Sequence, residues 1–226
     1  MAKFCTNCGK KLEDGKPCDC QKNVTPEGSL GENLLDSFKG MFAKPVDTIK
    51  TYTDEKSFGM SMILVGIMSV LVGLLTMSLL KNFMEVFMDS ITSGLYYYST
   101  IDIPYAQGFF IAAIATFALS FAFTGLLYLV NTKMFKGEGT FKEIYSLYGV
   151  TSIINSVAVA ATAILLFVNG VVAIAVFAIG SLLTLIYLIK GLNLIGPKDE
   201  NKHGYIYIIT TIIYVVAMII IMAIFQ

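Results

Sequence analysis

The sequence VTSIINSVAVAATAILLFVNGVVAIAVFAIGSLLTLIYLI, residues 150–189, contains no charged side chain and no histidine. A transmembrane helix needs about 20 predominantly apolar residues, and this stretch is about twice that length. A single apolar helix so long would exceed the thickness of any bilayer. Asn169 and Gly170, near the middle, are typical turn residues. The stretch therefore predicts two membrane spans joined by a tight hairpin.

Three further stretches are long and apolar enough to cross a membrane. Together the five predicted spans are Phe58–Leu80, Ala106–Val130, Val150–Val168, Gly170–Ile189 and Tyr205–Phe225. They are continuously apolar and do not alternate, which favours helices and excludes a β-barrel. Of the 226 residues, 56% are hydrophobic and only 14% are charged, whereas soluble proteins carry about 25% charged residues. The predicted fold class is an all-α membrane protein with a five-transmembrane-helix bundle.

The lysines predict the orientation of this bundle. All sixteen basic residues are lysines, and the five spans place fifteen of them on one side, with Lys81 as the exception. Because lysine and arginine concentrate in cytoplasmic loops, we expect a multi-pass protein of the cell membrane with its amino terminus cytosolic and its carboxyl terminus outside. No arginine and no unbalanced block of lysines is present, so a nucleic-acid partner is excluded.

Residues 23–57 are predicted to form a linker and an amphipathic juxtamembrane helix, between a module of residues 1–22 and the membrane domain of residues 58–226. The helix would end before Pro45. Its apolar positions share one face and are Leu30, Leu34, Leu35, Phe38, Met41 and Phe42. The favoured interpretation is a helix lying on the cytosolic leaflet, because it adjoins a span. The alternative is a helix that binds a partner protein.

All four cysteines lie within the first 20 residues, at Cys5, Cys8, Cys18 and Cys20. The first pair is a C-x-x-C motif followed by glycine, and the C-x-C pair after a nine-residue loop can complete a tetrahedral site. A disulfide framework requires an oxidising compartment, whereas the lysines predict a cytosolic location. We therefore predict one structural Zn²⁺ ion bound by these four thiolates, in a small N-terminal cytosolic zinc ribbon. An iron–sulfur or catalytic site is the alternative.

Two parts of the chain resemble known families. The segment FCTNCGKKL, residues 4–12, resembles the zinc-ribbon module at the start of many bacterial membrane proteins. The chain from about residue 40 resembles the Yip family, named for Rab/Ypt GTPase-interacting proteins, in its five spans and in the loop KGEGTFKE, residues 136–143. The resemblance implies a Yip domain of the bacterial type. The Asp-Leu-Tyr-Gly-Pro motif of eukaryotic members is missing ahead of the first span, so GTPase binding is not implied.

Catalytic motifs are missing from the sequence, which contains no Walker loop, H-E-x-x-H pair or G-x-S-x-G elbow. We expect a non-enzymatic protein in which the zinc module is tethered to the bundle for partner docking, scaffolding or membrane organisation. Its expected partners are the lipid bilayer, a cytosolic protein bound through residues 1–42, and a second copy of the chain in a homo-oligomer. The alternative is a transporter or channel for a small or lipidic solute, although coupled carriers usually keep an ionisable group inside the bilayer.

Three features of the spans have both a structural and a functional interpretation. Small residues recur every fourth position in the second span, at Gly108, Ala112, Thr116, Ser120 and Thr124. Close helix packing is favoured over a solute path for this stripe. Asn155 is expected to form a hydrogen bond between helices. His203, the single histidine, is expected in a cytosolic loop, with a metal-binding or catalytic role as the minor alternative.

Overall fold

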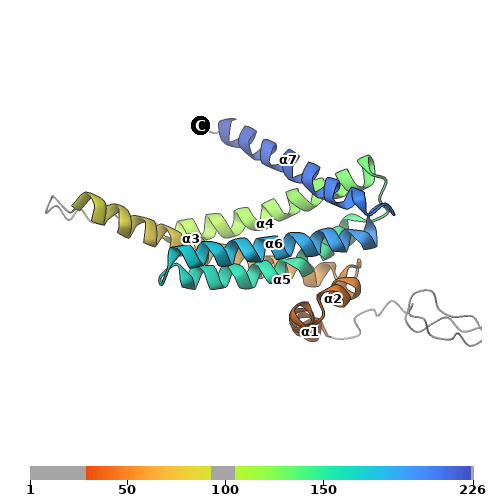
Figure 1. Cartoon of the computed structure of the whole chain (residues 1–226), viewed down its shortest axis with the longest axis horizontal. Coiled ribbons are helices and arrows are strands. Elements are labelled where there is room, and N and C mark those ends of the chain that lie inside the picture. Colours follow the sequence, from red (N-terminus) through yellow and green to blue (C-terminus); the bar gives the residue numbers. More distant parts are fainter. Residues whose placement is uncertain (1–28, 93–104, 225–226) are drawn as a thin grey trace, which may run out of the picture.

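The computed structural model describes residues 29–92 and 105–224, with the side chains of all but residues 83–92. The described residues form helices joined by short connections (Figure 1). In chain order the helices are α1 (Leu30–Ala43), α2 (Pro45–Tyr52), α3 (Phe58–Thr92), α4 (Tyr105–Leu129), the π-helix η2 (Val130–Met134), α5 (Phe141–Leu165), α6 (Gly170–Ile195) and α7 (Asn201–Ile224).

Five of these helices are long and apolar enough to cross a membrane, which confirms the five predicted spans. The third begins earlier than expected, because α5 starts at Phe141 and not at Val150. A capping box starts it early: the Thr140 hydroxyl accepts a hydrogen bond from the Glu143 amide at 3.3 Å, and the Glu143 carboxylate accepts one from the Thr140 amide at 2.8 Å. These contacts satisfy amide groups that a helix start would leave unpaired.

Helix α5 is the centre of the bundle. It packs against α3 on one side and α6 on the other, and 67% of its most apolar stretch is buried inside the protein, compared with 28% or less in the other spans. The backbones approach closely because Gly149 faces Ser61 of α3, and Gly180 of α6 faces Ala158. Small residues at such contacts are the usual means by which membrane helices pack. The remaining spans expose large apolar side chains, as lipid-facing helices do.

The predicted hairpin between the third and fourth spans is confirmed. Helix α5 ends at Leu165, and α6 begins at Gly170 with Asn169 as its N-cap. The Asn169 side-chain oxygen accepts hydrogen bonds from the amides of Val171 and Val172 at 3.0 and 3.1 Å. Asparagine is among the best N-cap residues, so this polar residue between two apolar segments starts α6 directly after the turn that follows α5.

Helix α7 leaves the bundle at an angle. In Figure 1 it crosses α4 near the start of α7, and its carboxyl end lies away from α5 and α6. Its most apolar stretch is only 11% buried. The divergence of α7 from the other spans opens the cavity described below.

Helices α1 and α2 form an amino-terminal hairpin that packs against the bundle beside α5 and α6 (Figure 1). Helix α1 was predicted, and its Ser29–Glu32 capping box starts it. Helix α2 was not predicted: Pro45 does end α1, but it also occupies the first turn of a second helix, where its fixed φ angle is favourable. Met41 and Ile49, at 1% and 2% exposure, belong to the core of the bundle. The hairpin is therefore part of the membrane domain's own core.

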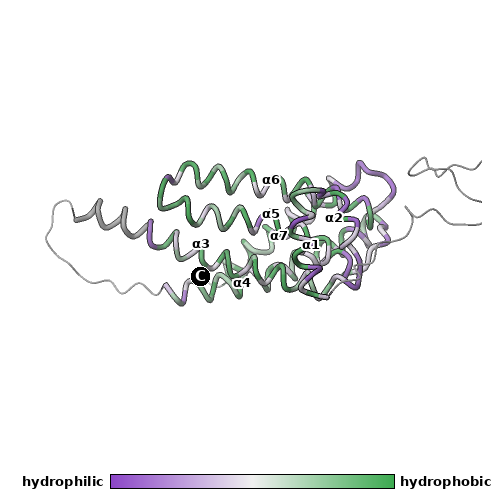
Figure 2. Tube along the Cα trace, turned by 90° about the horizontal axis from the view of Figure 1, so that it is seen from below, coloured by the Kyte–Doolittle hydropathy of each residue, from purple (hydrophilic) through white to green (hydrophobic). Residues whose placement is uncertain are grey.

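The polar residues gather at the end of the bundle that carries this hairpin, which we call the hairpin end (Figure 2). Of the lysines in the described part of the chain, all but Lys81 lie on the hairpin or in the segments that meet at this end. The charge asymmetry read from the sequence is thus an asymmetry of the folded bundle.

Candidate functional site

The predicted zinc ligands Cys5, Cys8, Cys18 and Cys20 lie outside the described residues. Within residues 29–92 and 105–224, no group of three or more histidine, cysteine, aspartate or glutamate side chains is placed to hold a metal ion. The zinc site therefore stays a prediction, and the candidate sites that the structure offers are in the membrane domain.

His203 is not in a loop, contrary to expectation. It lies in the first turn of α7 and is 2% exposed. Its Nε2 atom is 2.9 Å from the Pro197 carbonyl oxygen, and its ring packs against Gly196, where a side chain would collide with it. The ring therefore closes the connection between α6 and α7, which is a structural role. The sequence did not predict a helical position for His203, because residues 198–202 are polar and α7 begins several residues before its apolar stretch.

The loop that connects the second and third spans is held by buried polar contacts. The Asn131 side-chain amide donates a hydrogen bond to the Ile195 carbonyl of α6 at 3.2 Å, and the Gly139 amide donates to the same oxygen at 2.9 Å. Gly137 lies against the Asn131 side chain, where a Cβ atom would not fit, and Lys136 takes a positive φ of 58°. The path of residues 136–139 thus requires glycine at positions 137 and 139 and is fixed to the end of α6.

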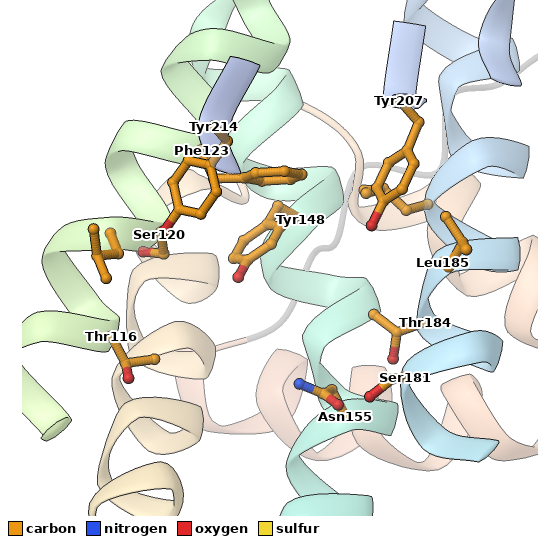
Figure 3. A pocket seen from close by; sticks show the side chains of 12 residues that line it. Thr116, Ser120, Phe123, Tyr148, Asn155, Ser181, Thr184, Leu185, Tyr207 and Tyr214 are labelled. Atoms are coloured by element: carbon orange, nitrogen blue, oxygen red, sulfur yellow. The ribbon is translucent and has the colours of Figure 1, made fainter. Parts of the chain in front are cut away.

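A cavity of about 390 Å³ lies between α4, α5, α6 and α7. Its lining combines aromatic rings with hydroxyl and amide groups and contains no acidic or basic residue. The lining residues are Thr116, Leu119, Ser120, Phe123, Tyr148, Asn155, Ser181, Thr184, Leu185, Leu188, Tyr207 and Tyr214 (Figure 3). We call this the bundle cavity. Its volume is within the range of small-molecule sites, roughly 300 to 1,000 Å³.

One side of the bundle cavity is an aromatic cluster centred on Phe123 of α4. The centroid of its ring lies 5.9 Å from that of Tyr148, 6.1 Å from that of Tyr207 and 5.5 Å from that of Tyr214. The contacts with Tyr207 and Tyr214 are edge-to-face, a geometry that aromatic rings prefer. The cluster joins α4 and α5 to the otherwise divergent α7 and forms a wall of phenol rings (Figure 3).

The opposite side of the bundle cavity is polar, and two of its hydroxyls are satisfied within their own helices. The hydroxyls of Ser120 and Thr184 donate to carbonyls of their own helices, at 2.6 and 2.9 Å. Asn155 is less well satisfied. Its amide nitrogen has only the Met68 sulfur of α3, at 3.8 Å, and its buried Oδ1 has no hydrogen-bond partner in the described part of the chain. The expected contact between helices is present but weak, and a buried acceptor has no partner in the described part of the chain.

Different parts of the small-residue stripe in the second span fit the two interpretations, close packing and a solute path. Gly108 packs against Leu80 of α3, as close packing predicts. Thr116 and Ser120, further along α4, line the bundle cavity. The stripe therefore serves packing near the start of α4 and lines the cavity in its middle.

The fold described above can be compared with known families. A family model described as the Yip1 domain matches residues 39–224. The chain belongs to the Yip1 domain family. Searches of curated proteins and of solved structures give no significant match. The matched range includes the last five residues of α1 and all of α2, which agrees with the packing of the amino-terminal hairpin into the bundle core. Yip1 family proteins are non-enzymatic membrane proteins.

The bundle cavity of this Yip1 domain has the lining of a binding site. Its phenols and hydroxyls can hydrogen-bond to a neutral polar group, and the aromatic and leucine side chains favour an apolar body. The sequence contained a partial signal, since Tyr148 and Asn155 on α5, and Tyr207 and Tyr214 on α7, are spaced by seven residues and so share a helix face. That spacing was missed because it is equally typical of helix packing.

Proposed function

We propose that this Yip1-domain protein is a scaffold of the cell membrane, whose bundle holds a zinc-binding amino-terminal module against the cytosolic face, where the module docks a protein partner. Cys5, Cys8, Cys18 and Cys20 bind the Zn²⁺ ion in this proposal. The amino terminus is cytosolic because the lysines concentrate on that side.

The observation that carries the proposal is the continuity of the amino-terminal hairpin with the bundle core. Met41 and Ile49 pack in one core with Leu147 of α5 and Leu192 of α6. The segment that precedes residue 29 is therefore attached to a helix hairpin that packs against the bundle. A module mounted in this way stays near the lipid surface, which raises its effective concentration toward partners at the membrane.

The test compares the full chain with a variant in which residues 1–28 are replaced by a Gly/Ser segment of equal length. We expect the variant to insert and to keep its thermal stability in detergent, because none of the packed residues is changed. Crosslinking in cells followed by mass spectrometry should identify a protein partner of the full chain. This partner should be missing from the crosslinks of the Gly/Ser variant and of Cys5→Ser/Cys8→Ser. Identical crosslinked proteins from all three chains would contradict the proposal.

A second function, binding or transport of a small or lipidic solute, is favoured by the bundle cavity. Its uncharged lining suits a neutral amphipathic molecule, since no aspartate, glutamate, histidine, lysine or arginine lines it. Ser120→Leu and Thr184→Leu would fill the cavity from two helices, while Ala122→Leu adds the same volume on the exposed face of α4.

Solvent extraction of the purified chains and mass spectrometry of the extract distinguish these variants. A solute site predicts that one neutral molecule copurifies with the wild type and with Ala122→Leu, and is lost from both cavity variants. Equal recovery from all four chains would leave the scaffold as the function of this domain.

A further inference from the structure

A second cavity, of about 280 Å³, lies where α2 of the amino-terminal hairpin meets the end of α6. We call it the α2–α6 cavity. Its lining is Val46, Ile49, Lys50, Lys190, Gly191, Asn193 and Leu194. Two lysines from segments far apart in the sequence thus face one small space, and none of the lining residues is acidic.

Neither lysine is neutralised within the described part of the chain. No ion pair joins Lys50 or Lys190 to a carboxylate there, and the nearest acid in sequence, the exposed Asp47, does not line the cavity. Both lysines are exposed and line the same space, where their like charges repel each other. An anion placed between them would replace this repulsion by two favourable contacts. The charge arrangement therefore suits an anionic group that is small enough for the cavity.

The position of Lys190 places this cavity at the edge of the lipid-facing surface. Leu183 and Ile186 lie on the same face of α6, seven and four residues before Lys190, and are 40% and 49% exposed. They are lipid-facing positions of a membrane span. Lys190 is thus the first charged residue beyond the apolar surface of α6, at the depth where lipid headgroups begin.

The walls of the α2–α6 cavity match the two parts of an amphipathic ligand. Val46 and Leu194 are apolar and 41% and 43% exposed, so they can contact the glycerol carbons of a lipid headgroup. Asn193, also exposed, adds a side-chain amide that can donate hydrogen bonds to phosphate oxygens. The lysines supply the charge, and lysine is a regular phosphate ligand in proteins.

From these observations we propose that the α2–α6 cavity is a binding site for a phosphate group, with Lys50 and Lys190 as its ligands. The phosphate comes either from an anionic phospholipid in the adjoining leaflet or from free phosphate in solution. The site adds to the proposed scaffold a specific contact with the membrane, because a bound headgroup would tie α2 to α6 across the boundary of the bilayer.

The test uses the purified full chain and the double variant Lys50→Gln/Lys190→Gln. The matched control is Lys142→Gln/Lys198→Gln, which removes the same charge from exposed lysines at the hairpin end that do not line the cavity. One arm titrates each chain with phosphatidylglycerol or phosphatidylcholine and counts bound lipids by native mass spectrometry. The other arm measures the thermal shift caused by inorganic phosphate, with chloride at equal ionic strength as the reference.

A lipid source predicts one tightly bound phosphatidylglycerol on the wild type and the control, no comparable binding of phosphatidylcholine, and no thermal shift with inorganic phosphate. A lysine near a charged lipid surface contributes roughly fivefold in affinity, so the double variant should bind about 25-fold more weakly. A free-phosphate source predicts the reverse pattern, a thermal shift that only the double variant loses. Equal behaviour of the double variant and the control in both arms would refute the phosphate site.

Discussion

The substitution Ile49→Ala tests whether the amino-terminal hairpin is part of the core. Ile49 lies on α2, is 2% exposed and packs in the core cluster of the bundle. The change removes three carbon atoms, worth about 0.8 kcal/mol each from lost burial, and leaves a cavity. Substitutions of buried isoleucine by alanine cost about 2 to 5 kcal/mol in total. The structure places this cost on the docking of the hairpin against α5 and α6.

Hydrogen–deuterium exchange of the chain in nanodiscs measures that cost locally. A loss of about 2 to 3 kcal/mol in docking energy should speed the exchange of α2 amides by roughly 30- to 150-fold, because exchange follows the population of the open state. The matched control is Leu35→Ala on α1, where the side chain is 61% exposed and the expected change is within about 0.5 kcal/mol. Equal exchange of α2 in the two variants would refute the inference that the hairpin shares the bundle core.

Three further predictions concern the metal, the orientation and a helix cap. Elemental analysis should find one zinc per chain, and replacing the first two cysteines by serine should remove it; unchanged zinc would exclude these ligands. A reporter active only outside the cytosol should work when fused after Gln226 and fail when fused after Gly137, and the opposite pattern would reverse the orientation. The pKa of Glu32 is lowered because the Ser29 backbone amide, and then the Ser29 hydroxyl, hydrogen-bond with its carboxylate. The contribution of this carboxylate to the α1 cap is therefore complete above the ordinary pKa of glutamate, about 4.3, and is lost as the pH falls through the lowered pKa. Protection of the α1 amides from hydrogen exchange should therefore fall in acid and stay constant between about pH 6 and 8.

Much of the membrane architecture could be predicted because its signals are local. Long apolar stretches identify spans regardless of how they pack, and Asn169 and the Thr140–Glu143 pair are helix caps recognisable from a few neighbouring residues. Helix α2 was missed for the opposite reason. Its eight residues are half polar, and short isolated helices are unstable, so it depends on Ile49 and Tyr52 packing against the bundle.

The bundle cavity could not be predicted because it depends on the spacing between helices. The spacing of seven residues places Tyr207 and Tyr214 on one face of α7. This spacing does not determine the distance between that face and α5. The angle at which α7 leaves the bundle decides this distance. His203 was misplaced for a related reason, since its burial follows from the contact of its ring with the Pro197 carbonyl and not from any pattern around it.

The central position of α5 has a consequence for how the protein is made. It is the least apolar of the five spans, and serine and threonine hydroxyls on it bond to carbonyls of the same helix, as Thr151, Ser152 and Ser156 do. Alone in lipid, such a helix would enter the bilayer less readily than its neighbours. We expect the translocation machinery to release α5 only together with α6, as one hairpin folded at Asn169, so that synthesis of the fourth span is a condition for stable insertion of the third.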